Sequence, residues 1–298
     1  MSLEGKTVLL TGGSGFIGRN LLESSLTSRY KVLAPRHSEL DLGDEFAVGN
    51  YLEQHHVAAV IHAAIKPAHR AVKDRTNVLS DNLRYFYSLA RHEDRLEKII
   101  VLGSGSVYDA RFYKPGLKES DFDFSIPIDD LGLFKYAINK SILPNSKIFD
   151  LRIFGIYGPY EDYRIRFPSN MICKALLGLP MTMKQNRLFD YIYVNDLPQI
   201  LDWVLLGSPI HRQYNITSGN PGYLLDLATL IREMTGSSSE IIVETSGLAA
   251  PYVGSSERLH TENKQLRFTP FREGLQMLID WYRKLLPQLD RSLFQENL

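Results

Sequence analysis

The sequence has a single cysteine, Cys173, among its 298 residues, so it cannot form an internal disulfide. Such sparse cysteine usage is typical of a protein from a reducing compartment. There is no run of about 18 apolar residues, and no basic segment precedes the first apolar run in MSLEGKTVLLTGG. We therefore expect a cytoplasmic protein with neither a membrane span nor a secretory signal.

An excess of charge of one sign is also absent. Lys and Arg total 34, and Asp and Glu total 34, so the net charge is zero at pH 7. A chain with this balance is not expected to bind nucleic acid or an anionic membrane surface. No metal site is expected either, because His55 and His56 are adjacent and the other histidines are scattered. The 44% apolar content, in contrast, predicts a globular protein with a full core.

The first half of the chain alternates short apolar runs with longer amphipathic stretches. The apolar runs cover residues 7–10, 31–34, 58–64, 98–104 and 148–154, and helix-like stretches lie near 16–28, 44–55, 75–92 and 129–143. Near-continuous apolar strands separated by helices indicate a parallel sheet that is covered on both faces. We therefore predict an α/β fold with a doubly wound parallel Rossmann sheet.

Beyond residue 160 the sequence is less regular and richer in proline, arginine and aromatic residues. Helices are predicted near 168–178, 196–206, 224–235 and 271–286. We interpret residues 1–160 as a dinucleotide-binding domain and residues 161–298 as a smaller, mixed C-terminal substrate-binding lid. The segments FDYIYVNDL and QYNITSG, near 188–217, are expected to return the chain to the first domain.

The stretch TVLLTGGSGFIGRNLL places Gly12, Gly15 and Gly18 directly after a predicted strand and at the start of a helix. Glycines let the backbone turn tightly and approach a pyrophosphate, whose charge is received by the amides at the helix N-terminus. Because the strand, the helix and the βα rhythm accompany the triplet, we predict a dinucleotide site here. It is expected to include Phe16 and Ile17.

The end of the second predicted strand, VLAPRHSELDL, bears on the choice of cofactor. In NAD-binding proteins an acidic residue about 20 positions after the glycines holds the ribose 2′-hydroxyl, whereas an arginine accommodates the 2′-phosphate of NADP. Arg36 and His37 come first here, and Glu39 is the earliest carboxylate, so we favour NADP(H). NAD(H) stays possible if Glu39 binds the ribose. Asp41 could meet the adenine or cap the next helix.

The helix-like stretch FKYAINK places Tyr136 and Lys140 four residues apart and therefore on one helix face. Together with the glycine pattern, HAA at 62–64 and LGSGSVYD at 102–109, this pair resembles the extended short-chain dehydrogenase/reductase family. The similarity is to its nucleotide-sugar epimerases, dehydratases and 4-keto reductases. It continues through LRIFGIYGPY, RLFDYIYVNDL and the C-terminal KQLRFTPFREGLQMLIDWYRK, and so covers nearly the whole chain.

The resemblance implies that Tyr136, Lys140 and Ser104 are the catalytic residues. A free tyrosine has a pKa of about 10, and a nearby cation such as Lys140 would lower it. Lys140 would also hold the nicotinamide ribose. Ser104 ends a predicted strand, where ligands bind in such sheets, and its hydroxyl can donate to a sugar carbonyl. The alternative is that Tyr136 and Lys140 are only neighbours on the surface.

The resemblance implies further residues beside each ligand. Those expected at the cofactor are Ala63, Ala64 and Asn82, with Asn77 as a competitor for the place of Asn82. Those expected at the substrate are Ser106, Tyr108, Asn170, Arg187 and Arg258. A guanidinium binds phosphate bidentately, so Arg187 is assigned to the substrate diphosphate. Arg258 could be a second such group or a solvated loop residue.

The surroundings of Ser104 bear on the reaction. Dehydratases of the family carry an Asp-Glu pair after the catalytic Ser or Thr, and those positions hold Gly105 and Ser106 here, so dehydration is not expected. The chain looks closest to the GDP-fucose-synthase type, which reduces a 4-keto-6-deoxy sugar nucleotide with NADPH. The Cys and His that epimerise in that type fall on Ser106 and near Met171, which favours a plain 4-keto reductase.

Two alternatives to this reductase stay open. One is a 4-epimerase that retains its NAD, and the other is a catalytically silent dinucleotide-binding module. The expected partner is a nucleoside-diphosphate sugar. The resemblance also implies a homodimer, which would form through the helices near 75–92 and 129–143.

Overall fold

The computed structural model describes residues 3–67 and 74–294. Its largest element is a six-stranded sheet of order β10-β5-β4-β3-β1-β2, in which all neighbouring strands are parallel. The strands are β1 (Thr7–Thr11), β2 (Lys31–Leu33), β3 (Val57–His62), β4 (Lys98–Ser104), β5 (Ile148–Ile153) and β10 (Gln213–Ile216). The strand order reverses at β1, between β2 and β3. The predicted doubly wound α/β fold is therefore confirmed.

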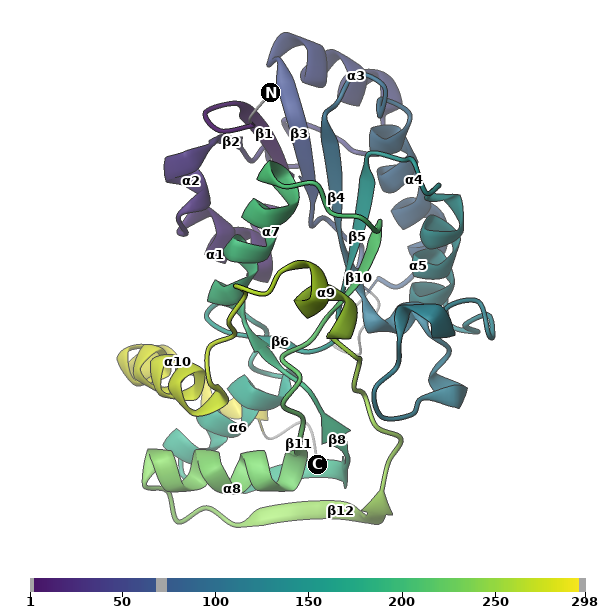
Figure 1. Cartoon of the computed structure of the whole chain (residues 1–298). Helices are drawn as coiled ribbons and strands as arrows, with labels where there is room; N and C mark the ends of the chain where they lie inside the picture. Colours follow the sequence, from purple (N-terminus) through teal and green to yellow (C-terminus); the bar gives the residue numbers. More distant parts are fainter. Residues whose placement is uncertain (1–2, 68–73, 295–298) are drawn as a thin grey trace.

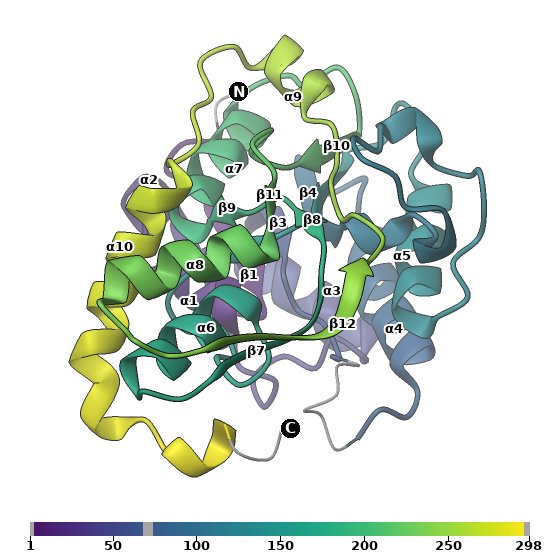
Figure 2. The same cartoon turned by 90° about the horizontal axis from the view of Figure 1, so that it is seen from below.

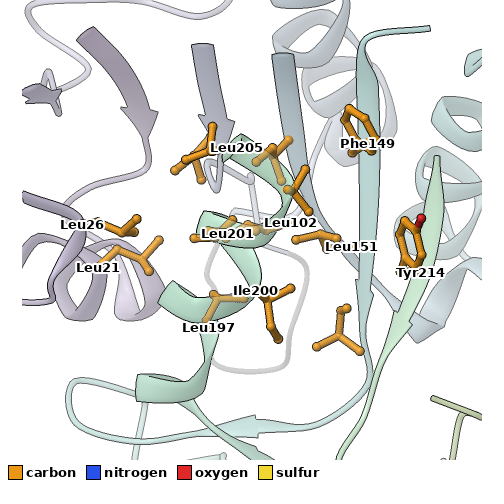
Figure 3. Close-up of a cluster of buried hydrophobic side chains, with 14 of the residues drawn as sticks. Leu21, Leu26, Leu102, Phe149, Leu151, Leu197, Ile200, Leu201, Leu205 and Tyr214 are labelled. Atoms are coloured by element: carbon orange, nitrogen blue, oxygen red, sulfur yellow. The ribbon is translucent and has the colours of Figure 1, made fainter. Parts of the chain in front are cut away.

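Helices cover both faces of this sheet (Figure 1). On one face lie α1 (Phe16–Leu22), α2 (Leu26–Arg29) and α7 (Leu197–Leu206), and on the other lie α3 (Glu45–Gln54), α4 (Val78–Ala90) and α5 (Asp130–Ser141). Successive strand side chains point to opposite faces, so Val8 and Leu10 join the first core whereas Leu9 joins the second. Figure 3 shows the first core, where leucines of α7 meet Leu102 and Leu151.

The stretch predicted as one helix over residues 16–28 is interrupted at residues 23–25. The Ser24 hydroxyl donates to the carbonyl of Leu21 and accepts from the amide of Leu26, at 2.7 and 3.3 Å. A serine that bonds the local backbone in this way competes with the helical hydrogen bonds. The result is two short helices, α1 and α2, in place of one.

A separate hydrophobic core lies in the C-terminal part of the chain. Its helices are α6 (Phe167–Leu176), α8 (Leu224–Thr235) and α10 (Phe271–Leu285), and its strands are β7 (Met181–Asn186) and β12 (Ile241–Leu248). Figure 2 shows α8 beside α6, with α10 to the left of both and the β7–β12 pair alongside. Two shorter pairs are β6 (Ile156–Tyr157) with β9 (Ile192–Tyr193), and β8 (Leu188–Phe189) with β11 (Gly222–Tyr223).

Segments that follow β5 in the chain return to the main sheet. The helix α7 packs on the face that carries α1, and β10 pairs with β5 as an edge strand. The short helix α9 (Glu257–Glu262) returns beside β10, where Arg258 donates to the carbonyl of Gln213 at 3.0 Å. Within the described residues, every helix is too short or too polar to cross a membrane.

Candidate functional site

Backbone segments pack so closely at the turn after β1 that only glycine fits at two positions, Gly12 and Gly18. Gly12 has a φ of +72°, and a Cβ on it would lie 2.7 Å from the amide nitrogen of Ala64. A Cβ on Gly18 would lie 2.2 Å from the carbonyl oxygen of Gly12. The first turn of α1, with Phe16 and Ile17, is therefore held directly against the glycine turn and its N-terminal amides face the end of β1.

A hollow of about 340 Å³ adjoins this turn. Its lining includes Gly12, Arg36, His37, Ala64 and Lys66. The backbone atoms of Ala63 lie behind Gly12, within 2.8 Å of the place a Cβ would take there. A concave site beside a glycine turn and a helix N-terminus fits the adenine-nucleotide half of a dinucleotide.

The acidic residues near Arg36 are tied into the local backbone. Glu39 accepts from the amide of Arg36 at 2.7 Å, and Asp41 accepts from the amide of Gly43 at 2.7 Å. The Asp41 carboxylate also lies 3.7 Å from the ring of His37. The exposed side chains that face the hollow from this loop are therefore those of Arg36 and His37.

Asn82 acts through the loop that lines the hollow. Its side-chain oxygen accepts from the amide of Lys66 at 2.8 Å, and its side-chain nitrogen donates to the carbonyls of Lys66 and Val78 at 3.0 and 2.8 Å. The buried amide thus fixes residues 65–66 against α4. Its competitor, Asn77, precedes the first turn of α4 in a left-handed conformation.

Two lysines of α5 have different surroundings, and Lys135 is the one that faces the glycine turn. Its ammonium is buried and donates to the carbonyl of Leu102 at 3.2 Å. Burial lowers its pKa to about 8. Burial, and then the charge of Lys135, lower the pKa of His62 to about 3. His62 in turn lies 2.8 Å from the hydroxyl of Thr11, directly before Gly12.

The predicted pair Tyr136 and Lys140 lies on another side of α5. The Tyr136 hydroxyl donates to Asp123, and the Lys140 ammonium donates to the same carboxylate at 2.8 Å. Lys140 is half exposed and lines a hollow of about 510 Å³ next to β10, which also includes Arg212. The strand β10 is four strands away from β1.

This placement corrects the prediction that Tyr136 and Lys140 face the cofactor. The hydrogen bond to Asp123 raises the pKa of Tyr136 and outweighs the opposing charge of Lys140, and the hydroxyl is already engaged by that carboxylate. Adjacent helix residues point about 100° apart, so Lys135 reaches the Leu102 carbonyl and the surroundings of His62 while Tyr136 points to Asp123. One turn before Lys135 stands Leu131, which has no hydroxyl.

Ser104 lies at the carboxyl end of β4, as predicted, but its partner is a different tyrosine. Its Oγ is 3.3 Å from the hydroxyl of Tyr252 and accepts from the amide of Ser106 at 3.1 Å. Tyr252 belongs to the segment between β12 and α9. No sequence pattern singles out Tyr252, whereas the apolar neighbours of Lys135 were a signal that this lysine is buried.

Three residues predicted to bind substrate have hydrogen-bond partners within the fold. Tyr108 is buried, donates to the side chain of Asn215 at 2.7 Å and accepts from Arg152 at 2.8 Å. Asn170 donates to the carbonyls of residues 163 and 164. Arg258 is engaged beside β10 and lines the same hollow as Lys140. Their side chains have hydrogen-bond partners within the fold, and their contact with a substrate stays a prediction.

The other two predicted substrate residues are Ser106 and Arg187. The Ser106 hydroxyl is buried and has no hydrogen-bond partner in the described part of the chain. Arg187 lies close enough to Tyr113 and Tyr191 that its charge opposes the rise in their pKa values that burial causes. Across residues 3–67 and 74–294, no three His, Cys, Asp or Glu side chains gather as a metal site.

The parallel sheet, the glycine turn and the adjoining hollow define a dinucleotide-binding protein of the Rossmann class. Residues 8–217 match the NAD dependent epimerase/dehydratase family. The chain belongs to this family, and the resemblance to the extended short-chain dehydrogenase/reductases is thereby confirmed.

Among curated proteins, the chain is 34% identical over 174 residues to a GDP-L-fucose synthase of Azorhizobium caulinodans, a match that covers 54% of the chain and 55% of that protein. The chain thus spans about half the length of this relative. Among solved structures, a GDP-L-fucose synthetase from Naegleria fowleri bound to NADP has a TM-score of 0.81 at 15% identity, with 96% of each chain covered. A UDP-glucose 4-epimerase from Thermotoga maritima has a TM-score of 0.78 at 19% identity, covering 94% of this chain and 99% of that one. At these identities the structures show the fold.

Proposed function

We propose that the protein is an NADPH-dependent reductase of a 4-keto nucleotide sugar. The observation that carries the cofactor choice is the loop after β2, where Arg36 and His37 face the hollow while Glu39 is bonded to the backbone. A guanidinium in that place suits a 2′-phosphate. The GDP-L-fucose synthase name of the curated relative supports the substrate class.

The chain's own residues can bind and orient both ligands. The amides of the glycine turn and of α1 receive the pyrophosphate, and Lys135 can donate to the hydroxyls of the nicotinamide ribose. A bound reduced nicotinamide supplies the hydride. Ser104 donates to the sugar carbonyl, which orients the carbonyl and stabilises charge on its oxygen.

We assign the diphosphate of the nucleotide sugar to Arg187, whose side chain has no hydrogen bond to described residues and lies near the tyrosines beside Ser104. The proposal also includes a homodimer formed through α4 and α5, and a cytoplasmic location. The size of the oligomer in solution tests the former.

One observation favours the silent alternative. The side of α5 that faces the glycine turn carries Leu131 where a phenol would serve as the acid. A protein in which no acid beside Ser104 can protonate the sugar carbonyl would bind a dinucleotide and catalyse no reduction. Turnover therefore has to be measured alongside cofactor binding.

Affinity for the two cofactors tests the proposal directly. NADPH is expected to raise the melting temperature more than NADH does, because a ligand selective for the native state stabilises it by mass action. Arg36→Ala should weaken NADPH binding by roughly tenfold or more and leave NADH binding unchanged. Arg95→Ala, an exposed arginine outside the hollow, is the matched control.

The reaction is tested with 4-keto-6-deoxy sugars carried on GDP, dTDP and UDP. Oxidation of NADPH that depends on one of these sugars supports the reductase. Copurified NAD(H), with interconversion of sugar nucleotides in the absence of added cofactor, would instead establish the 4-epimerase. Binding of a dinucleotide with neither reaction would establish the silent module.

A further inference from the structure

A carbonyl reduction needs a proton for the oxygen, and α5 has no phenol on the side of Lys135, whose ammonium donates to the carbonyl of Leu102 and is assigned to the nicotinamide ribose. Tyr136 is the only tyrosine of this helix, and its hydroxyl is bonded to Asp123. Lys135 faces the glycine turn, but Leu131 precedes it by one helical turn. A phenolic donor at this site therefore has to come from another element.

The phenol of Tyr252 lies at the carboxyl end of β4, beside Ser104. Its hydroxyl lies 3.3 Å from Ser104 Oγ, and a Cβ on Gly105 would come within 2.8 Å of the same hydroxyl. The phenol thus lies over the carboxyl ends of the parallel strands, where ligands bind in such sheets.

The position of Tyr252 is fixed by its backbone and by neighbouring rings. Its amide donates to the carbonyl of Leu188 at 2.9 Å, and it forms a bridge with Phe189. Its ring centroid lies 5.0 Å from that of Phe154 and 5.1 Å from that of Phe189. A side chain held in this way keeps its hydroxyl at Ser104 without a rearrangement during reaction.

Tyr113 is the other phenol in this cluster. Its ring centroid lies 5.4 Å from that of Tyr252, but its hydroxyl donates to the carbonyl of Gly105 at 3.4 Å. Of the described tyrosines, Tyr252 is the one whose hydroxyl contacts Ser104. The choice between the two phenols therefore falls on Tyr252.

We infer that Tyr252, which the lid side of the chain supplies, is the proton donor of the reduction and works with Ser104; the inference rests on the proposed function. The carbonyl carbon accepts a hydride from the reduced nicotinamide, and the carbonyl π electrons move to the oxygen. That oxygen takes the phenolic proton of Tyr252, and the resulting phenolate regains a proton from water. The sugar is reduced to the alcohol and the nicotinamide is oxidised.

The surroundings suit a donor better than a base. Burial raises the pKa of Tyr252 to about 12, so the phenol stays protonated at neutral pH. A reduction needs the protonated form, whereas an epimerase that first oxidises C4 needs a base at this position. The site thus favours the reductive direction.

Three variants that each remove one phenolic oxygen test the inference. Tyr252→Phe should lower kcat by roughly 100-fold or more, because a general acid contributes that much, while the KM of the sugar and the Kd of NADPH change little. Tyr136→Phe should retain turnover, since its hydroxyl belongs to the Asp123 pair. Tyr223→Phe, in an exposed position of β11, is the control for the change itself.

Turnover by Tyr252→Phe within about threefold of the wild type overturns the inference. So does a loss in Tyr252→Phe that is accompanied by equal loss of NADPH binding, because the residue would then only hold the fold. An active wild type with an active Tyr252→Phe leaves the proposed function intact. A wild type that reduces none of the 4-keto sugars refutes the proposed function and the inference with it.

Discussion

The lysine that we propose for the nicotinamide ribose lies five positions before the one that the sequence pattern favours along α5. The pattern YAINK is real in the sequence, but only the packing shows that Lys135 is buried against β4 and that Lys140 pairs with Asp123 at the surface. Sequence spacing states which residues share a helix face and leaves open what that face meets. The glycine turn and Ser104 were predictable because their places depend on strand ends, which the apolar runs mark.

The burial of Lys135 predicts an effect on protein stability that Lys140 should not have. Its pKa is about 8 in the folded chain, below the ordinary 10.5, so the folded state is disfavoured on the order of 3 kcal/mol wherever the lysine is charged in both states. Lys135→Met, of similar volume, should raise the melting temperature of the apo protein at pH 7 and weaken NADPH binding.

The gain from Lys135→Met should shrink as the pH rises from about 8 to 10.5, because the folded wild type then loses its proton first. Thermal unfolding at several pH values measures this. Lys140→Met, half exposed, should change the melting temperature little at any pH. An equal gain in both variants would show that Lys135 is not buried as described.

At the scale of elements, five of the six strands of the main sheet were predicted within two residues at each end, whereas β10 was expected only as a return of the chain near 188–217. Continuous burial on both faces leaves an apolar run with clear ends, and α8 over residues 224–235 was likewise predicted from its periodicity. The two-residue strands β6, β8, β9 and β11 were not predicted. Their pairing joins distant residues, such as Gly222 with Phe189, and short segments carry too few side chains for a period to appear.

The junction between β1 and α1 gives a prediction at this scale. Gly18→Ala would place a Cβ 2.2 Å from the carbonyl oxygen of Gly12 and 2.6 Å from Gly13 Cα, and both are backbone atoms that cannot move aside. We expect a loss of roughly 1–3 kcal/mol in unfolding free energy and a larger proportional loss of NADPH affinity. Denaturant unfolding and cofactor titration measure the two effects.

Gly49→Ala, within α3, is the comparison. A Cβ there meets only the ring edge of His92, at 3.0 Å, and alanine is the better helix former by about 1 kcal/mol. Its stability should stay near that of the wild type, and cofactor binding should be unchanged. Similar NADPH affinity in Gly18→Ala and wild type would contradict the role given to the glycine turn.

For the whole molecule, the zero net charge means that general charge repulsion is weak near neutral pH. The pH dependence of stability then rests on a few buried groups. Glu161, in the core of the C-terminal part, accepts from the amide of Ser169 at 3.3 Å, and its second oxygen has no hydrogen-bond partner among the described residues. Burial raises the pKa of Glu161 to about 8.

A carboxyl whose folded pKa lies above its unfolded value of 4.5 favours folding fully below that value, and the benefit is lost as the pH rises to about 8. Lys135 disfavours the folded state until the pH exceeds about 8. The melting temperature should therefore pass through a minimum near pH 8. Glu161→Gln keeps the shape of the side chain and the hydrogen bond from Ser169. In this variant the melting temperature should no longer fall as the pH rises towards 8. Its melting temperature should exceed that of the wild type by several degrees at pH 8.5 and by far less at pH 5. Glu233→Gln, at an exposed position of α8, is the control and should have the pH dependence of the wild type. If the melting temperatures of Glu161→Gln and the wild type changed in parallel with pH, the Glu161 carboxyl would be in contact with water and the prediction would be wrong.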